Sequence, residues 1–452
     1  MIRRYITACL SLAMLFGCNV DDPKPSTGGV DFGGGGNGGE GGSNSDAGGN
    51  GGSSDSAGAA GLGQAGSGQA GSTASTPAKQ CERGLVVVMG DYKSTNVGIT
   101  KLDGTPLSSS FISSGAAKPG LALALSGDVD VPRAAPTSKR VVLIDRFGSN
   151  VITWMDLESA TVLAQLRVGT GFESNPQDYA EFDTDRAVIS RYGTNSSPGH
   201  EDFDQGGDLL VIDTKTPKIL ERIAMPEENT ELLPRPAGIT KLGDVLVVAL
   251  ERLSFDFDSC GEGRFVGVSP KDGKIVYTVD IPKLKNCGRL AISPSGKLGA
   301  VACSSQFDGG TYRYNPEESD VVIFDLTVSP PKEMRRLGLG VALDAGLQPS
   351  VEFASEDHVL ALAYGGNSTV GDRAVLAEID TGKYETVAES KGPYNLSGIH
   401  CSPGCGDVCV ISDGETGKLR RFTLGDSGKI ENLSDITVDT TIGLPPRRIG
   451  AL

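Results

Sequence analysis

Three features of the sequence predict an all-β fold and, within that class, a ring of seven four-stranded sheets, a β-propeller. Short apolar runs bounded by Gly, Pro and Asp follow one another from residue 81 onward, and no long run has the helical period of 3.6. These runs recur in units of roughly fifty residues. The first unit lacks an opening strand and the chain ends with an extra one, so the last strand can complete the first sheet.

Each unit from the third onward starts with a short opening segment that is followed by an apolar strand. The opening segments begin at residues 175, 235, 286, 348, 394 and 445, which lie 46 to 62 residues apart. A second strand then ends in Asp in several units, as at Asp213, Asp325 and Asp380. Four antiparallel strands per unit at this spacing are typical of a propeller blade.

The first two units are the least regular. We expect the first at 84–89, 97–102 and 106–112, with residues 446–452 as its missing strand. The second should contain strands at 121–125, 140–144, 151–157 and 162–168. Because the region from 115 to 140 is irregular, six or eight blades remain alternatives to seven, and a pair of face-packed sheets is a further one.

The N-terminus predicts export. A basic start at Arg3 and Arg4 precedes an apolar run that ends near Phe16, too short to span a bilayer. The sequence Leu15-Phe16-Gly17-Cys18 resembles the lipobox of bacterial lipoproteins. That resemblance implies that residues 1–17 are a signal peptide and that Cys18 carries the lipid. Asn19 does not match the Asp retention signal of enteric bacteria, which favours the outer membrane or the cell surface.

Residues 18–80 are predicted to be a disordered, lipid-anchored linker. From 27 to 78 the chain is almost entirely Gly, Ser, Ala, Asn and Gln, and such a segment has too little apolar surface to offset its ordering entropy. The folded part should therefore be residues 81–452, a single propeller. The segment 292–297, Ile-Ser-Pro-Ser-Gly-Lys, resembles the SPDGK turn of YVTN-type bacterial propellers, with Ser295 in the place of the usual Asp. This resemblance implies a fold and not an activity.

The charge balance excludes nucleic acid as a partner. The chain has 41 basic and 57 acidic residues, and loss of Arg3 and Arg4 with the signal peptide leaves 39 basic residues, a balance of −18. No basic cluster with interleaved aromatic residues appears. We expect a monomer whose partners are the membrane, through the lipid, and a protein or an envelope glycan.

The cysteines of the folded part predict disulfides, because an exported protein meets an oxidising compartment. Cys287 and Cys303 lie on consecutive strands, with Cys260 as an alternative partner for either, and Cys401 and Cys409 flank a short turn. A third bridge between Cys81 and Cys405 would join the N-terminus to the last blade. Seven cysteines leave one thiol free. The alternative is a metal site made of His400 with the last three cysteines, Cys401, Cys405 and Cys409.

Long loops between the second and third strands of the middle units carry the candidate ligand residues. In a propeller these loops emerge on one face around the channel mouth, and their mixture of acidic, aromatic and Arg side chains suits a macromolecular ligand. The candidates are His200, Glu201, Asp202, Asp204, Asp256, Asp258, Asp308, Tyr312, Arg313 and Tyr314. Carboxylates also suit Ca²⁺, for which the ligands would be Glu201, Asp202, Asp204 and Asp208.

These observations favour a non-enzymatic protein. No HExxH, GxSxG, Walker A or dinucleotide-binding motif appears, and the chain has three histidines. We expect no organic cofactor and no catalytic residue. The leading interpretation is a membrane-tethered, extracytoplasmic propeller that binds a protein or envelope ligand through the long loops. Two alternatives stay open: a metal-dependent lactonase-like hydrolase or lyase, and a scaffold of an outer-membrane assembly machine.

Overall fold

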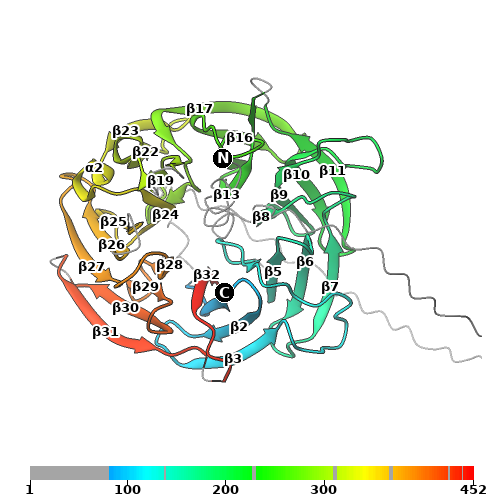
Figure 1. Cartoon of the computed structure of the whole chain (residues 1–452), viewed down its shortest axis with the longest axis horizontal. Helices are drawn as coiled ribbons and strands as arrows, with labels where there is room; N and C mark the ends of the chain where they lie inside the picture. The colour runs from blue at the N-terminus through cyan, green and yellow to red at the C-terminus, as the bar shows by residue number, and fades with distance from the viewer. Residues whose placement is uncertain are drawn as a thin grey trace, which may run out of the picture. The chain divides into compact units, whose positions relative to one another are not determined.

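Seven antiparallel four-stranded sheets, the blades, follow one another around a ring (Figure 1). The computed structural model describes residues 81–136, 139–226, 231–308, 313–365, 370–425, 428–439 and 441–452. The prediction of a seven-bladed propeller is confirmed, against six or eight blades and against two face-packed sheets.

The first four blades each run from an innermost strand at the ring axis to an outermost one. From the inside outward, blade 1 consists of β32 (Pro446–Ala451), β1 (Leu85–Gly90), β2 (Thr95–Thr100) and β3 (Pro106–Ser113). Blade 2 consists of β4 (Val129–Asp130), β5 (Arg140–Asp145), β6 (Val151–Asp156) and β7 (Val162–Arg167). Blade 3 consists of β8 (Pro176–Glu181), β9 (Arg186–Thr194), β10 (Gly206–Asp213) and β11 (Lys218–Ala224). Blade 4 consists of β13 (Pro236–Leu242), β14 (Val245–Leu250), β16 (Glu262–Ser269) and β17 (Lys274–Lys285).

The remaining three blades follow the same order. Blade 5 consists of β18 (Ala291–Ile292), β19 (Leu298–Ser304), β22 (Ser319–Asp325) and β23 (Lys332–Arg336). Blade 6 consists of β24 (Leu347–Phe353), β25 (His358–Ala363), β26 (Arg373–Glu378) and β27 (Tyr384–Glu389). Blade 7 consists of β28 (Leu396–Ser402), β29 (Val408–Asp413), β30 (Lys418–Leu424) and β31 (Ile430–Ile436).

Short strands and helical turns lie in the loops between the blade strands. β12 (Leu232–Leu233) pairs with β15 (Leu253–Ser254), and β20 (Phe307–Asp308) pairs with β21 (Arg313–Tyr314). A 3-10 turn, η2 (Pro316–Glu318), and a short helix, α2 (Leu339–Leu343), lie in blade 5 and in the connection to blade 6. In the described part of the chain, no helix is long and apolar enough to cross a membrane.

The core consists of seven apolar clusters, one between each pair of neighbouring blades, including the seventh and the first. Strand β1 shows the arrangement: Leu85, Val87 and Met89 contact blade 7, and the alternate residues Val86 and Val88 contact blade 2. Both faces of a blade are therefore buried. This explains why the sequence contains continuous apolar runs instead of alternating apolar and polar residues.

The last strand closes the ring as predicted. β32 pairs antiparallel with β1, with Leu85 opposite Ala451 and Val87 opposite Ile449. Figure 1 shows β32, coloured red, in the same blade as the blue β2 and β3. Two further backbone bonds, from Arg83 N to Leu452 O (2.7 Å) and from Leu452 N to Gly84 O (2.9 Å), extend this pairing.

One expected strand is absent. Residues 121–125 do not form the innermost strand of blade 2, which is the two-residue β4. The Gln165 side chain of the outermost strand β7 explains the difference. Its Oε1 accepts hydrogen bonds from the backbone N–H groups of Ala122 (2.9 Å) and Leu123 (2.8 Å), so a side chain satisfies donors that a strand would have used.

Candidate functional site

All seven blades contribute residues to a cavity of about 130 Å³ at one end of the central channel, which we call the channel mouth. The residues come from the start of each innermost strand and from the loops between second and third strands. Tyr92, Arg146, Glu251 and Tyr364 belong to those loops in blades 1, 2, 4 and 6. The channel mouth is therefore at the end of the ring where these loops emerge.

The start of each innermost strand is shaped to present side chains to this cavity. In four blades the residue at this point, Asn175, Arg235, Asn286 or Tyr394, has a left-handed backbone conformation, with φ between 45° and 62°. In blades 3, 4, 6 and 7, the register between the innermost strand and the next strand shifts near the start of the innermost strand. Such bulges re-aim side chains, and the residues concerned, such as those at 177–178 and 396–397, line the mouth.

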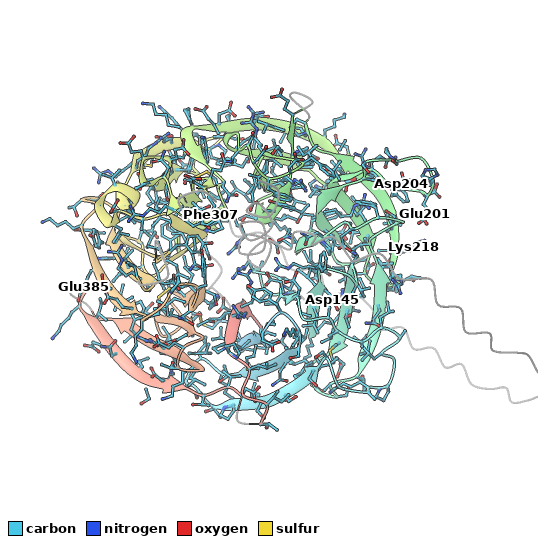
Figure 2. All side chains as sticks on the ribbon, viewed as in Figure 1. Asp145, Glu201, Asp204, Lys218, Phe307 and Glu385 are labelled. Atoms are coloured by element: carbon cyan, nitrogen blue, oxygen red, sulfur yellow. A yellow bond between two sulfur atoms is a disulfide. The ribbon has the colours of Figure 1, made fainter. Side chains whose placement is uncertain are left out.

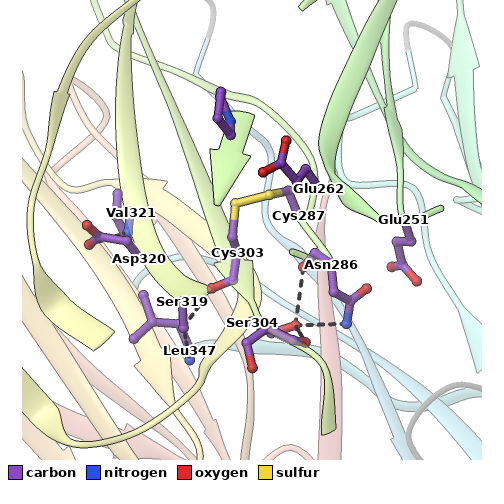
Figure 3. The surroundings of a disulfide bond; sticks show 12 residues. Glu251, Glu262, Asn286, Cys287, Cys303, Ser304, Ser319, Asp320, Val321 and Leu347 are labelled. Atoms are coloured by element: carbon purple, nitrogen blue, oxygen red, sulfur yellow. Dashed lines mark hydrogen bonds between the residues drawn. A yellow bond between two sulfur atoms is a disulfide. The ribbon is translucent and has the colours of Figure 1, made fainter. Parts of the chain in front are cut away.

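Tight packing between innermost strands sets the position of Arg289. A Cβ on Gly288 would lie 1.9 Å from the carbonyl oxygen of Pro349, and a Cβ on Gly238 would lie 2.5 Å from the Arg289 Cβ. Only glycine fits at such approaches. The adjacent Cys287–Cys303 disulfide ties this segment to β19, as Figure 3 shows. Asn286 Nδ2 donates to Ser304 Oγ (2.8 Å) beside it.

The lining is rich in arginine although the chain as a whole is acidic. Five arginines and three carboxylates line the mouth, whereas the whole chain carries a formal charge of −16. The arginines are Arg133, Arg146, Arg289, Arg447 and Arg448, and the carboxylates are Asp130, Asp178 and Glu251. The excess of arginine over carboxylate in the lining makes this concave surface more attractive to anions than the acidic surface of the rest of the chain.

Three of the arginines are held by carboxylates. Arg146 Nε donates to Asp128 Oδ1 (3.2 Å), and its Nη1 donates to Gln177 Oε1 (3.0 Å). Burial alone would lower the pKa of Arg146, but Asp128 and Asp130 outweigh burial and raise it. Arg289 Nη2 donates to Glu352 Oε1 (3.0 Å).

Arg448 Nε lies 3.4 Å from Asp130 Oδ2. Burial favours the neutral form of Asp130, but the nearby Arg448, Arg133 and Arg146 outweigh it and lower the pKa of this carboxyl. Asp130 is therefore ionised at neutral pH, and its negative charge holds Arg448 in place.

The other two arginines have no carboxylate partner in the described residues, within 4.0 Å. Arg133 Nη1 donates to the Ile449 carbonyl (3.3 Å), and burial lowers the pKa of its guanidinium. Arg447 Nε donates to the Gly90 carbonyl (2.6 Å), and its guanidinium lies 4.5 Å from the centre of the Tyr92 ring. Both retain N–H donors for an incoming anion.

Glu251 is a buried acid of the mouth with a raised pKa. Its Oε2 accepts a hydrogen bond from the Tyr192 hydroxyl at 2.5 Å, and the residue is 5% exposed. Burial raises its pKa to about 7, against smaller opposing effects of Tyr192, Arg235 and Arg146. Burial likewise raises the pKa of Asp178, whose carboxylate accepts from the backbone N–H groups of Tyr179 and Ile239. Glu251 can therefore gain or lose a proton near neutral pH.

Aromatic rings form one side of the mouth. Tyr364 and Tyr394 both line it, with ring centres 5.9 Å apart. Tyr314 stacks on Tyr364 at 4.6 Å with an interplanar angle of 8°, and it is 7% exposed. Asp372 fixes the segment that carries Tyr394 by accepting from the N–H groups of Asn395 (2.6 Å) and Leu396 (3.0 Å).

None of the loop candidates that the structure describes lines this cavity. His200, Glu201 and Asp202 are exposed, and Figure 2 shows Glu201 and Asp204 at the outer margin of the ring. Asp204 is buried and holds its own loop, since its carboxylate accepts from the backbone N–H groups of Gly199, His200 and Glu201.

The remaining loop candidates are spread over blades 4 and 5. Asp256 and Asp258 are exposed, and Asp258 Oδ1 accepts from the Ser254 hydroxyl at 2.8 Å. Asp308 and Arg313 are exposed in the small β20–β21 hairpin. Tyr314 is buried and supports Tyr364 from outside the cavity, and Tyr312 lies outside the described residues.

The carboxylates proposed for Ca²⁺ are not gathered around one point. Both oxygens of Asp208 are engaged by Arg191, at 2.7 Å each, and Arg222 Nε lies 2.6 Å from Oδ2. Asp208 and Arg191 are fully buried. Within the described ranges, no group of three or more His, Cys, Asp and Glu side chains is arranged to hold a metal ion.

The cysteines pair as predicted: Cys81 with Cys405, Cys287 with Cys303, and Cys401 with Cys409, and Cys260 is a free thiol. The alternative metal site at Cys401, Cys405 and Cys409 is therefore wrong, because all three thiols are consumed in disulfides. His400, its fourth proposed ligand, lies 2.7 Å from Glu82 Oε2 through its Nε2 atom. The proposed lipid site, Cys18, lies outside the described residues.

Three arginines of the mouth lie in segments that the sequence marks as the start of a unit. Arg289, Arg447 and Arg448 sit in the opening segments at 286–289 and 445–448. In a propeller, residues at equivalent places in successive units meet around the axis. Recurrence of a charged side chain at that place was therefore a signal for the site, and a search limited to long loops misses it.

Comparisons with known proteins support the fold class and no more. The chain matches no family model and no curated protein. Among solved structures it is similar to the periplasmic gluconolactonase of Pseudomonas aeruginosa (11% identity, 82% of this chain and 98% of that chain, TM-score 0.53). It is also similar to a hypothetical selenium-binding protein from Sulfolobus tokodaii (10% identity, 82% of this chain and 94% of that chain, TM-score 0.53). A third similar structure is that of a protein from Lactobacillus plantarum (11% identity, 82% of this chain and 99% of that chain, TM-score 0.53). At these identities the likeness concerns the fold alone, so the protein is placed in the class of seven-bladed β-propellers.

Proposed function

We propose that this protein is an extracytoplasmic, membrane-tethered propeller that binds an anionic ligand in the channel mouth. The observation that carries the proposal is the convergence of five guanidinium groups on one cavity of about 130 Å³ in an otherwise acidic chain. Arg133 and Arg447 have donors left over, and Arg146, Arg289 and Arg448 are held in place by carboxylates. Preorganised guanidinium groups bind carboxylate or phosphate oxygens by charge-assisted hydrogen bonds.

The cellular placement rests on the sequence features at the N-terminus and is part of the proposal. A lipid on Cys18 and a flexible linker up to residue 80 would tether the propeller to the outer membrane or the cell surface. Three disulfides within the propeller suit an oxidising compartment.

The position of Cys81 also suits this placement. Cys81 is bonded to Cys405 in the turn after β28, and Leu396 at the other end of β28 lines the mouth. Cys81, at the start of the propeller, therefore lies at the end of the ring opposite the mouth.

The long loops remain the proposed contact surface for a macromolecular ligand. They emerge at the same end of the ring as the mouth, because the loop that follows β14 begins at Glu251. A glycan or protein that places an anionic group in the mouth would meet the exposed side chains of these loops, such as Asp256 and Arg313. The mouth would bind the anionic group specifically, and the loops would contact the rest of the ligand around it.

Titration calorimetry on the full chain with inorganic phosphate and with succinate tests the proposal. We expect binding of at least one of these anions, weakened about tenfold by Arg133→Gln and by Arg447→Gln, since each loses a charge-assisted hydrogen bond. Arg186→Gln is the matched control, because Arg186 is paired with Asp183 on the exposed surface of blade 3. No binding of either anion, or an equal effect of the control, would count against the proposal.

A second candidate function, lactone hydrolysis, is favoured by Glu251. A carboxyl with a pKa of about 7 in a cavity with arginines can accept a proton from water, and the arginines can stabilise a developing oxyanion. The likeness to a gluconolactonase, which concerns the fold, supplies a substrate to test. Turnover of gluconolactone that is abolished by Glu251→Gln and retained in Arg186→Gln would establish this alternative in preference to binding alone.

A further inference from the structure

The channel mouth combines two features that a simple anion site does not need. The first is the set of guanidinium groups already described. The second is a fixed aromatic wall, made of Tyr364 and Tyr394, on the same cavity. Aromatic faces contact the apolar C–H surfaces of ligands, whereas a small inorganic anion gains nothing from them.

The aromatic wall is rigid before any ligand binds. Tyr314 stacks on Tyr364 from behind, at 4.6 Å, which restrains its ring. Tyr394 has a left-handed backbone, with φ of 62°, and the buried Asp372 carboxylate holds the two N–H groups that follow it. Non-glycine residues adopt this conformation at a cost, and such strain tends to cluster where a side chain must be held for function.

The mouth also offers hydroxyl and amide groups. Ser350 and Gln348 line it next to the tyrosines. Gln348 Nε2 donates to the Leu396 carbonyl (2.6 Å), which leaves its Oε1 as an acceptor. Among the described residues, the Ser350 hydroxyl makes no hydrogen bond to another protein group. These groups suit a ligand that carries hydroxyls of its own.

The local charge balance limits the negative charge that a ligand can carry. The five arginines of the lining face its three carboxylates, and Asp128 and Glu352 lie directly behind Arg146 and Arg289. Five positive and five negative groups thus surround the site, with Glu251 partly protonated near pH 7. A planar monoanion can pair with a guanidinium group in the two-pronged geometry of an Arg–carboxylate pair. A dianion would meet more repulsion from Asp130 and Asp178.

From these features we infer that the ligand is a sugar acid, specifically a hexuronic acid residue, with its carboxylate on the arginines and its pyranose ring against Tyr364 and Tyr394. This inference rests on the proposed function, since it names the ligand class of the same site. The cavity, about 130 Å³, is small beside the roughly 300 to 1,000 Å³ of drug-sized pockets, so it takes one residue, such as the end of an acidic glycan.

Calorimetry on the wild-type full chain with four probes tests the inference: glucuronate, glucose, glucose 6-phosphate and inorganic phosphate. We expect glucuronate to bind at least tenfold more tightly than each of the other three. If glucose 6-phosphate or inorganic phosphate binds as tightly as glucuronate, the sugar-acid inference is wrong and the anion-binding function stands. If no charged probe binds, both fail.

Two variants of Tyr394 separate the ring contact from the charge contact. Tyr394→Ala should reduce the ratio of the glucuronate to the phosphate association constant about tenfold, and Tyr394→Phe, which keeps the ring, should leave that ratio within twofold of wild type. Tyr384→Ala, on the outermost strand of blade 6, is the control and should change neither affinity. An unchanged ratio in a folded Tyr394→Ala chain overturns the inference. The wild-type probe comparison decides the question if that variant does not fold.

Discussion

Arg448 in the last strand and Asp130 in the second blade form an ion pair at the channel mouth, with 3.4 Å between Nε and Oδ2. The same seven residues that close the ring, 446–452, therefore also deliver Arg447 and Arg448 to the candidate site. The strand that closes the ring therefore also completes the candidate site.

Removing the Asp130 charge should tighten anion binding. Asp130→Asn frees Arg448 and removes one negative charge from the cavity, so we expect phosphate to bind about three- to tenfold more tightly. The same substitution should lower the free energy of unfolding by about 1–3 kcal/mol, because Arg448 and Arg146 lose a partner. Calorimetry and urea unfolding measure the two effects. Asp244→Asn, at an exposed surface ion pair with Lys271, should change neither. Weaker phosphate binding in Asp130→Asn would contradict the charge argument.

Glu251 should make stability fall as pH rises. Its pKa is about 7 in the folded chain and near the ordinary 4.5 when unfolded, so the folded state holds the proton more tightly. This contribution is fully present below about pH 4.5 and is lost as pH rises through about 7. Glu251→Gln keeps an acceptor for Tyr192 and cannot ionise. We compare the free energy of unfolding of Glu251→Gln with that of the wild type at each pH. The difference in favour of the variant should be larger at pH 8 than at pH 4.5, by on the order of 3 kcal/mol. Urea unfolding at the two pH values checks this, and an equal difference at both would show that the pKa is ordinary.

The Cys81–Cys405 disulfide should stabilise the ring more than the Cys401–Cys409 disulfide, which closes a much shorter loop. Cys81 and Cys405 are 324 residues apart and Cys401 and Cys409 are eight apart. Chain-entropy arguments give about 6 kcal/mol for the long loop and about 2.5 kcal/mol for the short one. Paired Cys→Ser variants, compared by guanidinium unfolding under non-reducing conditions, test the order. The opposite order would mean that the ends are held mainly by β32 and by the Glu82–His400 contact.

The buried Arg191–Asp208 pair should be essential for folding, in contrast to exposed pairs. Asp208→Asn leaves the Arg191 guanidinium, which is fully buried, without its counter-charge, and such a change typically costs about 3–5 kcal/mol. Lys139→Ala, which breaks the exposed pair with Glu158, should cost no more than about 1 kcal/mol. Thermal unfolding of both variants gives the comparison, and similar losses would refute it.

Cys260 should resist thiol reagents in the folded protein. It lies partly buried between β15 and β16, and burial raises the pKa of its thiol to about 12, so little thiolate exists at pH 8. Iodoacetamide labelling followed by peptide mass spectrometry should find Cys260 modified slowly until denaturant is added. Rapid labelling at pH 8 without denaturant would show that the thiol is exposed or its pKa is ordinary.

Local sequence was sufficient to predict the fold because a propeller repeats one unit. Each unit buries both faces against its neighbours, so the strands appear as continuous apolar runs, and the leftover strand 446–452 predicted how the ring closes. Strand order also favoured the pairing of Cys287 with Cys303, for which Cys260 was the alternative partner. The prediction failed at 121–125, where the Gln165 side chain replaces a strand partner, because such a contact depends on a residue 42 or 43 positions away.

The sequence by itself determined the repeat and the ring closure, since these depend on hydrophobic period and spacing. The structure decided that Cys303 pairs with Cys287 and not with Cys260. Only the tertiary structure decided which charged residues share a site. Arg133, Arg289 and Arg448 are up to 315 positions apart, and they meet because the starts of the innermost strands converge on one axis. Asp204 and Asp208 look equally available in the sequence, but in the fold the first holds its own loop and the second is buried against arginine. Distance to the ring axis, which no local pattern encodes, separates the candidate site from the loops.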